Sequence, residues 1–311
     1  MPKKITLTIF TILISFIFSL MIGEGIVYTF FPQEQHYPIL KSKEYGIQYP
    51  PETIITHKIG SNARQYTTNN LGHRLITHKP IKKDIVLLGD SFTFGIGVPD
   101  GKEWASVLQD NSSYNVINLG MSGWGLTQQI KRYYELDSVL NLNPSIVVLM
   151  FCDNDVLDNT LNPVTSVESN KFKFSSLPIE IKSPSFYSSL GQKSNLVRLI
   201  KRTQIIRNKE KIKHYDQDYY NNLLNLFSAK MKAEGVKLYF ISVNNCYNNI
   251  KTTKLSKFKK IESKVLELHE SNLLTYINSN DITYNFKQSP VGHYDVDWNN
   301  DIGIGLSRIL K

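Results

Sequence analysis

The sequence predicts an α/β fold, namely a flavodoxin-like three-layer α/β/α sandwich with a parallel sheet, preceded by one N-terminal transmembrane helix. Short apolar runs rich in branched residues alternate with helix-like stretches, which is typical of a parallel sheet covered on both faces. The 311 residues are enough for one large domain with an appendage. An apolar stretch of membrane-spanning length at the N-terminus predicts the additional helix.

The N-terminal stretch differs in composition from the rest of the chain. Lys3 and Lys4 precede an uncharged, mainly apolar run over residues 5–22, and apolar residues continue past Glu24 to Phe31. A cleaved signal peptide is the alternative, but no Ala-x-Ala-like cleavage site follows and the run is long for a signal sequence. We therefore expect an uncleaved anchor over residues 1–31. Lysines before a span stay cytoplasmic, which would put the remaining chain outside the plasma membrane.

The rest of the chain divides by composition into an extension and a domain. Residues 32–83 form a polar extension with five prolines, which we expect to pack on the following domain instead of acting as a free linker. That domain should occupy residues 84–311. An insertion at about residues 157–216, with three prolines and many serines, interrupts its alternation. Insertions beside a crevice often shape specificity.

Strands and helices are expected to alternate along this domain, as a parallel sheet requires. The expected strands are residues 85–88, 116–118, 146–151 and 236–243, with a weaker one near 282–286. The expected helices are residues 104–109, 126–140, 218–233, 257–272 and 301–310.

The first apolar run is followed without a spacer by Gly89-Asp90-Ser91, and Gly95 and Gly97 then mark a loop. A serine at the carboxyl end of a parallel strand lies in the crevice where open α/β sheets bind their ligands. A helix that began there would add free backbone N–H groups, which stabilise negative charge. The alternative is a strand-to-helix turn with a capping hydroxyl and no chemistry.

Three further segments each come shortly after an apolar run. They are residues 118–125 (Asn-Leu-Gly-Met-Ser-Gly-Trp-Gly), 151–156 (Phe-Cys-Asp-Asn-Asp-Val) and 292–299 (Gly-His-Tyr-Asp-Val-Asp-Trp-Asn). In this order, and together with Gly-Asp-Ser, they resemble the blocks of the SGNH (GDSL-type) serine hydrolases over about residues 66–311. Residues 66–74 resemble the Asn-x-x-Gly-x-Arg segment that often precedes the catalytic domain in membrane-anchored members of that family.

The resemblance implies a flavodoxin-like domain in which Ser91 is the nucleophile. A serine hydroxyl needs an adjacent base, and the family pattern assigns that role to His293, just before the last helix. The oxyanion formed on attack would be held by the backbone N–H groups of Ser91 and Gly123 and by the side-chain amide of Asn154. The resemblance implies no cofactor and no metal ion.

Three positions depart from the family pattern. Cys152 replaces a glycine in the third block, and Trp298 replaces a glycine five residues after the histidine. Pro290 stands where the family usually has an aspartate, three residues before the histidine. The carboxylate that would orient the ring of His293 therefore cannot be identified from spacing.

Asp295 and Asp297 follow His293 too closely to be assumed to face its ring, and we expect both at the surface. A backbone carbonyl can accept the same hydrogen bond as the missing aspartate. The sequence therefore predicts a slow Ser–His dyad, supported in that way or by a carboxylate from elsewhere.

The expected function is that of a serine-dependent O-acyl esterase that acts outside the cytoplasm on an acylated glycan or lipid, through an acyl-enzyme intermediate. An O-acyltransferase that uses the same serine and histidine is the first alternative, because both reactions share the acyl-enzyme step. A catalytically inactive SGNH-like binding domain is the second, prompted by Pro290 and Trp298. The expected partners are the small acyl-ester substrate and the membrane, and the oligomeric state stays open.

The net charge of +9 comes largely from basic clusters within residues 193–213 and 251–264. These clusters are interpreted as solvated faces or as surfaces attracted to anionic headgroups or an acidic polymer. No nucleic-acid-binding module accompanies them, so no nucleic-acid partner is expected. The two cysteines, Cys152 and Cys246, each follow a strand-like run. They could form a disulfide in an oxidising compartment, with two buried free thiols as the alternative.

Overall fold

A computed structural model gives the fold for most of the chain. The described residues are 3–42, 45–77, 83–140, 142, 144–152, 154, 155, 158, 165–168, 171–174, 193–211, 217–243, 252–283 and 293–311. Contacts divide the chain into two units. The first comprises Met1–His36, His57–Ala63 and Lys182–Lys213, and the second comprises Tyr37–Thr56, Arg64–Ile181 and His214–Lys311. The predicted domain boundaries near residues 31 and 83 remain predictions.

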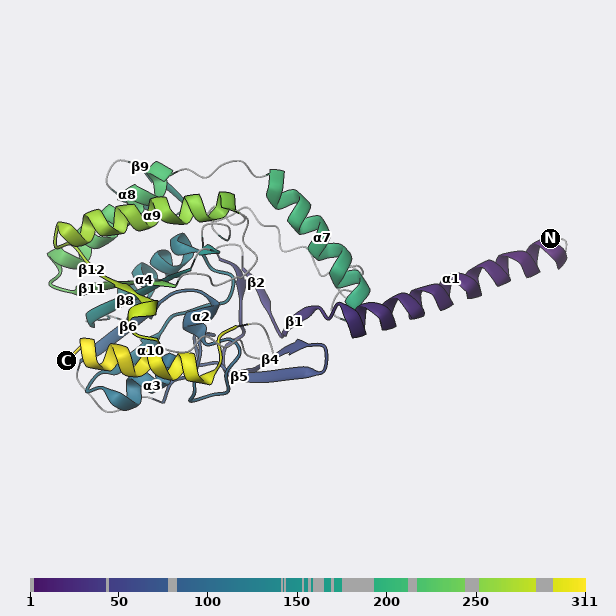
Figure 1. Cartoon of the computed structure of the whole chain (residues 1–311), viewed down its shortest axis with the longest axis horizontal. Helices are drawn as coiled ribbons and strands as arrows, with labels where there is room; N and C mark the ends of the chain where they lie inside the picture. The colour runs from purple at the N-terminus through teal and green to yellow at the C-terminus, as the bar shows by residue number, and fades with distance from the viewer. Residues whose placement is uncertain are drawn as a thin grey trace. The chain divides into compact units, whose positions relative to one another are not determined.

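The second unit is built around a five-stranded parallel sheet (Figure 1). Its strand order is β12-β11-β8-β6-β7. Numbered along the chain, this is the order 2-1-3-4-5 that defines the flavodoxin-like arrangement. The bounds are β6 (Asp84–Leu88), β7 (Asn115–Asn118), β8 (Pro144–Cys152), β11 (Lys237–Val243) and β12 (Thr275–Asn278). The expected fold class is confirmed.

Helices cover both faces of this sheet, because alternate side chains of each strand point to opposite faces. On β6, Val86 and Leu88 belong to the core that also contains residues of α4, α8 and α9. Ile85 and Leu87 belong to the core with residues of α3 and α10. The bounds of these helices are α3 (Trp104–Asn111), α4 (Leu126–Leu140), α8 (Gln217–Ala233), α9 (Thr252–Glu270) and α10 (Val296–Ile309).

Three expected elements differ clearly from the observed ones. The helix expected over residues 257–272 is α9, which begins five residues earlier, at Thr252. The fifth strand is β12 (Thr275–Asn278), not residues 282–286, and it pairs in parallel with Tyr239–Ser242 of β11. Ile282 and Thr283 are not in a strand, and residues 284–286 lie outside the described residues. The last helix starts at Val296, five residues earlier than expected, because the Asp295 side chain accepts a hydrogen bond from the backbone N–H of Trp298 and caps it.

The insertion contains regular structure. β9 (Thr165–Glu168) and β10 (Lys171–Phe174) form an antiparallel pair, and α7 (Asn195–Lys211) follows.

In the described residues, five short strands precede the main sheet. They are β1 (Glu34–Tyr37), β2 (Leu40–Ser42), β3 (Gly46–Gln48), β4 (Ile54–Ile59) and β5 (Asn62–Thr67). β2 pairs with β3, and a three-stranded sheet has the order β1-β4-β5.

Within the second unit, this part of the chain shares a small core with the loops after β6 and β7. The members from the extension are Tyr45, Tyr49, Ile55 and Tyr66, and those from the loops are Phe94, Ile96, Met121 and Trp124. The extension therefore packs directly on the segments that follow the sheet strands.

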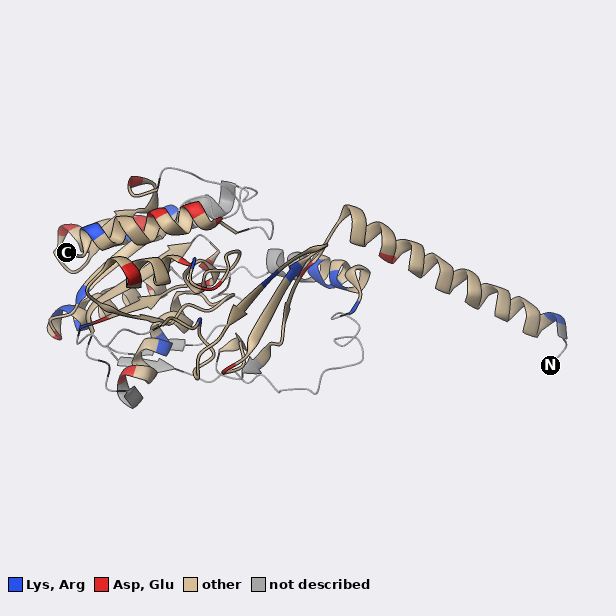
Figure 2. Ribbon diagram, turned by 90° about the horizontal axis from the view of Figure 1, so that it is seen from below, with Lys and Arg blue, Asp and Glu red and all other residues tan. Residues whose placement is uncertain are grey.

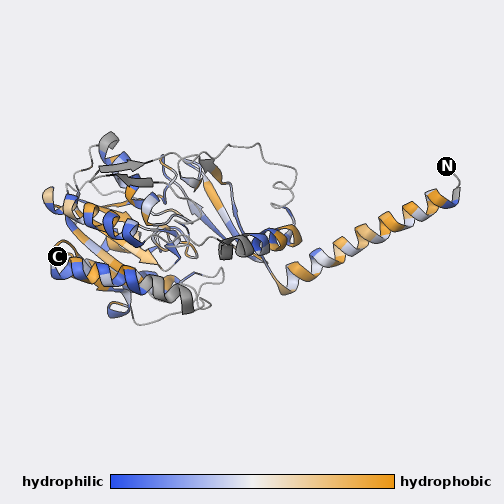
Figure 3. Cartoon of the chain, turned by 90° about the horizontal axis from the view of Figure 1, so that it is seen from above, coloured by the Kyte–Doolittle hydropathy of each residue, from blue (hydrophilic) through white to orange (hydrophobic). Residues whose placement is uncertain are grey.

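In the first unit, α1 (Lys3–Phe30) is long and apolar enough to cross a membrane. The stretch Lys4–Phe30 has 27 residues, and its most apolar 18-residue window has a mean hydropathy of 2.5 and is not buried. Figure 2 shows few charges along α1, and Figure 3 shows it mainly in hydrophobic colours. Glu24 near its end caps α7: its carboxylate accepts hydrogen bonds from the backbone N–H groups of Asn195 at 2.6 Å and Leu196 at 2.9 Å.

Candidate active site

Ser91 lies at the carboxyl end of β6, as the first residue of the short helix α2 (Ser91–Phe94). Gly89 makes the turn possible, because a Cβ there would lie 2.0 Å from Thr93 Oγ1. The Asp90 carboxylate accepts a hydrogen bond from the backbone N–H of Phe92 at 2.9 Å, which caps the helix. Ser91 itself is only 3% exposed. The sharp turn thus presents its hydroxyl at the edge of the sheet.

His293 meets this serine across 202 residues of sequence. Its Nε2 lies 2.9 Å from Ser91 Oγ, which is hydrogen-bond distance. The ring of Phe92 lies 5.1 Å from the imidazole, centroid to centroid. The structure therefore brings together the nucleophile and the base that the sequence predicts.

Trp298, one of the departures from the family pattern, packs against the residues that follow Ser91 and His293. Its side chain is fully buried. The ring centroid lies 4.5 Å from that of Tyr294 and 6.2 Å from that of Phe92, the two aromatic residues that follow His293 and Ser91. A large indole here packs the start of α10 against α2.

The two aspartates after His293 lie at the start of α10. The Asp295 carboxylate accepts a hydrogen bond from the backbone N–H of Trp298 at 3.1 Å and is committed to capping α10. Asp297 is exposed, and Asp295 is partly exposed. Pro290, where the family has its aspartate, lies outside the described residues.

Gly123 lies in the loop between β7 and α4, with a positive φ of 78° that favours glycine. The same loop contacts α2 closely, since a Cβ on Gly120 would lie 2.5 Å from Phe94 N. Asn118 ties the loop to α2: its Nδ2 donates to the Thr93 carbonyl at 2.8 Å, and its Oδ1 accepts from the backbone N–H of Gly120 at 2.9 Å. Sequence reasoning missed this role of Asn118, although the residue opens the second motif.

Asn154 lies beside the serine but is engaged with carboxylates. Its Nδ2 donates to Asp90 Oδ2 and to Asp158 Oδ2, both at 2.9 Å. An amide nitrogen has two hydrogens, so both are used. Donation to an oxyanion would require the Asn154 side chain to release one of these two acceptors.

Two buried carboxyls lie near each other, Asp90 next to the serine and Asp155 close enough to feel the charge of Asp90. Asp90 is fully buried, and burial raises its pKa to about 7 despite the hydrogen bonds that it accepts from Phe92 and Asn154. Asp155 is also fully buried, and burial, together with the nearby charge of Asp90, raises its pKa well above the usual range. Asp155 accepts hydrogen bonds from the backbone N–H of Cys152 and from Gln129 Nε2, both at 3.0 Å. Sequence reasoning assigned neither carboxyl a role.

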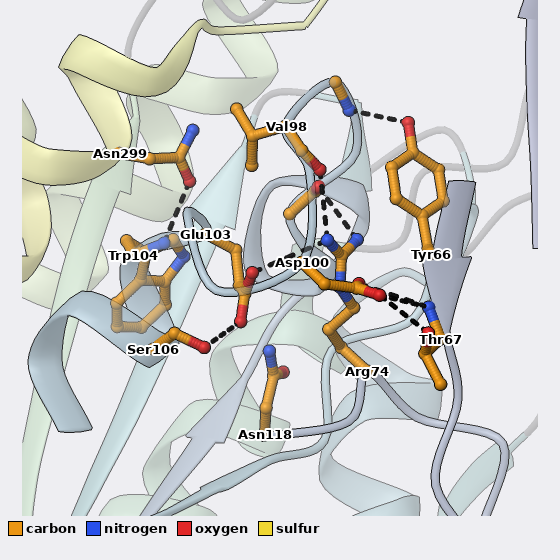
Figure 4. A network of polar contacts seen from close by, with 12 residues as sticks. Tyr66, Thr67, Arg74, Val98, Asp100, Glu103, Trp104, Ser106, Asn118 and Asn299 are labelled. Carbon is orange, nitrogen blue, oxygen red and sulfur yellow. Dashed lines mark hydrogen bonds and ion pairs between the residues drawn. The ribbon is translucent and has the colours of Figure 1, made fainter. Parts of the chain in front are cut away.

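Arg74 holds the loop that follows α2 (Figure 4). The side chain is fully buried and donates to the carbonyls of Gly95 at 3.3 Å and Val98 at 3.0 Å. Its Nε lies 2.9 Å from an Asp100 oxygen, and its guanidinium carbon lies 4.5 Å from the centre of the Tyr66 ring. The segment that resembles Asn-x-x-Gly-x-Arg thus fixes the loop behind the nucleophile.

His73, next to Arg74, holds the loop that carries Gly123. Its Nε2 accepts from Arg132 Nε at 3.1 Å, which leaves Nδ1 protonated to donate to the Gly120 carbonyl at 3.2 Å. Burial, helped by the charge of Arg132, lowers the pKa of His73 to about 3. The ring is therefore neutral near pH 7 and acts as a fixed hydrogen-bonding bridge.

Cys152, which ends β8 two residues before Asn154, is disulfide-bonded. The only other cysteine in the sequence is Cys246, which lies outside the described residues.

Comparison with known proteins gives one family match. The profile of the GDSL-like lipase/acylhydrolase family matches residues 87–249, more than half of the 311 residues. No curated protein matches the chain.

The chain is also similar to solved structures at low identity. Against the inhibitor-bound M. smegmatis aryl esterase, the identity is 13% and the TM-score 0.45, with 74% of this chain and 98% of that chain covered. Against Est24, a carbohydrate acetylesterase from Sinorhizobium meliloti, the values are 12%, 0.44, 74% and 98%. Against a member of the lipolytic protein G-D-S-L family from Veillonella parvula DSM 2008, they are 14%, 0.43, 73% and 98%.

Proposed function

This chain belongs to the GDSL-like lipase/acylhydrolase family and is a serine ester hydrolase, and on that premise we propose that it removes O-acyl groups with Ser91 as nucleophile and His293 as general base. The observation that carries the proposal is the 2.9 Å separation of His293 Nε2 and Ser91 Oγ. At that distance the ring can accept the hydroxyl proton directly.

The reaction would run in two halves. In the first, Ser91 Oγ attacks the ester carbonyl carbon while His293 Nε2 takes the hydroxyl proton. When the tetrahedral intermediate collapses, its carbon–oxygen bond to the alcohol breaks, His293 returns the proton to that alcohol, and the acyl group stays on Ser91. In the second, His293 deprotonates a water that attacks the acyl-enzyme. The acid then leaves, and Ser91 regains its proton from His293.

The oxyanion of each intermediate would be held by the backbone N–H groups of Ser91 and Gly123 and by Asn154. The role of Gly123 is supported by its position in a loop that is held at Gly120. There the backbone N–H is bonded to Asn118 and the carbonyl to His73. Asn154 would take part by giving up its hydrogen bond to Asp90 or Asp158. Such donors lower the barrier because they are oriented before charge develops.

The proposed place of action is outside the cytoplasm, with α1 anchoring the chain in the plasma membrane. Two observations support it: α1 is long and apolar enough to span a bilayer, and Lys3 and Lys4 precede the span. The disulfide at Cys152 also fits an oxidising compartment. The proposed substrate class is an acylated glycan or lipid of the cell surface, which such an anchored enzyme could reach.

The topology can be tested with spheroplasts. Protease added from outside should digest the domain of intact spheroplasts, and the undigested full-length protein should sediment with the membranes. A soluble mature form that starts after residue 25 would show that α1 is removed as a signal sequence.

The nucleophile can be tested with a fluorophosphonate probe, which labels activated serines covalently. The wild-type chain should be labelled and Ser91→Ala should not. Ser113→Ala, which alters an exposed serine outside the site, is the matched control and should be labelled like the wild type. Labelling of Ser91→Ala equal to that of the wild type would show that another residue is the nucleophile.

A model acyl donor offered with a sugar alcohol would separate hydrolysis from transfer. The proposal expects most of the acyl group to appear as free acid. Predominant acyl-sugar formation would assign the same two residues to an acyltransferase.

A further inference from the structure

A second group of chemically active side chains lies in the first unit, and none of them belongs to the candidate active site. Glu34 and His36 are both on β1, two residues apart, so they point to the same face of the strand. His57 is on β4, the neighbour of β1 in the strand order. The carboxylate oxygen and the two imidazole nitrogens all lie within 4.8 Å of one another.

The distances within this cluster are close to those of a metal coordination shell. Glu34 Oε1 lies 2.9 Å from His36 Nε2 and 3.1 Å from His57 Nε2. Around a tetrahedral ion with bonds of about 2.0–2.1 Å, neighbouring donors are about 3.3 Å apart. The two carboxylate–imidazole distances are a few tenths of an ångström shorter than this spacing, and the two imidazole nitrogens lie within 4.8 Å of each other, so rearrangement of these three side chains alone could admit an ion.

We propose that Glu34, His36 and His57 form a binding site for a divalent transition-metal ion of the Zn²⁺ class. Two imidazole nitrogens and one carboxylate oxygen suit such ions, whereas Ca²⁺ and Mg²⁺ require shells made of oxygen. Three protein donors leave the fourth tetrahedral position to a water molecule or another exogenous ligand. The ion would cross-link β1 to β4, which gives it a structural role in the first unit.

The burial of the three side chains supports a site that an ion can enter from one side. The His57 side chain is fully buried, that of His36 is 17% exposed, and that of Glu34 is 44% exposed. The rings of His36 and His57 are held together, with their centroids 4.1 Å apart. The cluster is thus largely arranged before an ion arrives.

Without a metal ion, the same three residues would form a hydrogen-bonded group in which one carboxylate oxygen serves two imidazoles. The two possibilities differ in what they predict for added metal. A hydrogen-bonded group gains nothing from Zn²⁺, whereas a coordination site binds it and stabilises the fold by mass action.

The test uses the full-length protein in detergent, stripped of metal with a chelator and titrated with Zn²⁺ against a chromogenic competitor. The wild type should bind one ion per chain with a Kd of about 1 μM or tighter, within the range of protein metal sites. His36→Ala and Glu34→Gln should each weaken binding at least about tenfold, in line with the loss of a ligand or its support. His269→Ala, which removes an exposed histidine from α9, is the matched control and should bind like the wild type.

The geometry can be tested separately with Co²⁺, whose visible absorption is strong when tetrahedral and weak when octahedral. The wild type should show the strong bands, and His36→Ala should lose them. His36→Ala and Glu34→Gln alter side chains that are at least partly exposed, and circular dichroism would show that both variants remain folded. Equal Zn²⁺ affinity in the wild type, His36→Ala and Glu34→Gln would refute the site. So would the absence of wild-type binding at a Zn²⁺ concentration ten times that of the protein.

Discussion

At two places in this protein a histidine Nε2 lies 2.9 Å from an oxygen, yet the two places support different chemistry. In the catalytic pair the oxygen is the hydroxyl of Ser91, which can lose a proton to the ring. In the cluster of Glu34, His36 and His57 the oxygen belongs to the carboxylate of Glu34, which in its ionised form only accepts hydrogen bonds and lies within reach of both rings. The comparison shows that the partner of the histidine, not the distance, determines what the ring can do.

The two places also differ in how the chain builds them. Ser91 and His293 are 202 residues apart and meet because parallel strands bring their carboxyl ends to one edge of the sheet. The cluster of Glu34, His36 and His57 is formed by two neighbouring strands, and its members lie within residues 34–57 of the sequence. The catalytic pair is buried, at 3% and 6% exposure, whereas the cluster opens to solvent at Glu34. A buried pair suits proton transfer, and an open cluster suits ion entry.

The largest effect is expected from removing the catalytic base. His293→Ala should lower kcat for a short acyl ester by about 10³-fold, because it removes the acceptor that lies 2.9 Å from Ser91 Oγ and leaves, among the described residues, only the more distant Asp90 carboxylate, at 3.4 Å, as a hydrogen-bond partner of the hydroxyl. His269→Ala should keep wild-type activity, since this exposed ring lies on α9. Steady-state kinetics on the three proteins checks this. Full activity in His293→Ala would show that this ring is not the general base. The chemical difference between the two histidine sites would then no longer hold.

The next effect concerns the oxyanion donors. Asn154→Ala should lower kcat by about 10²–10³-fold with little change in KM, because the amide would act on charge that develops only in the transition state. Asn300→Ala, at an exposed position on α10, is the control. An unchanged kcat in Asn154→Ala would mean that the amide stays bound to Asp90 and Asp158 during turnover.

A smaller effect should appear in the pH dependence of stability. The pKa of buried Asp90 is about 7 in the folded chain, against an ordinary value of 3.8. Between these values the folded chain keeps a proton that the unfolded chain has released, so the free energy of unfolding falls as the pH rises through this window and levels off above it.

Between pH 5 and pH 8 the wild type should therefore lose about 1–3 kcal/mol more stability than Asp90→Asn. Urea denaturation followed by tryptophan fluorescence at several pH values measures the difference. Parallel pH profiles of the two proteins would show that Asp90 is already ionised at pH 5.

The smallest effects are expected from replacing Asp295 and Asp297, the two aspartates that closely follow His293 in the sequence. Asp295→Ala should cost about 1 kcal/mol of stability, because it removes the cap of α10, and should leave activity largely intact. Asp297→Ala changes an exposed side chain and should stay within about 0.5 kcal/mol of the wild type. Thermal unfolding and ester hydrolysis should be measured on both. A strong activity loss in either folded variant would make that carboxylate part of the catalytic machinery and contradict the dyad.

Much of the fold could be predicted because its central strands are buried on both faces. β8 contains the apolar run Ile146–Cys152 and β11 the run Leu238–Ile241, a signal that needs no knowledge of their partners. β12 escaped prediction because it is an edge strand of four residues, Thr-Tyr-Ile-Asn, with a single buried position. Such a short alternation is too weak to separate from a loop.

The proximity of Ser91 and His293 could be predicted because both residues lie in sequence blocks with fixed order. The hydrogen bonds from Asn154 to Asp90 and Asp158 could not, because spacing places residues at a sheet edge without saying which polar atoms pair. The cluster of Glu34, His36 and His57 escaped for a similar reason. Its ligands depend on the pairing of β1 with β4, which no local pattern announces.

The packing of the extension bears on where this protein can be cut. Tyr45 stacks on Trp124 with ring centroids 4.6 Å apart, and Arg74 binds two carbonyls of the loop after α2. A chain shortened to begin at β6 would expose Phe94 and Trp124 to water and leave that loop without its anchor. Such an exposed apolar patch promotes aggregation. The smallest autonomously folding, soluble fragment should therefore begin before Tyr45, although the sheet itself begins at Asp84.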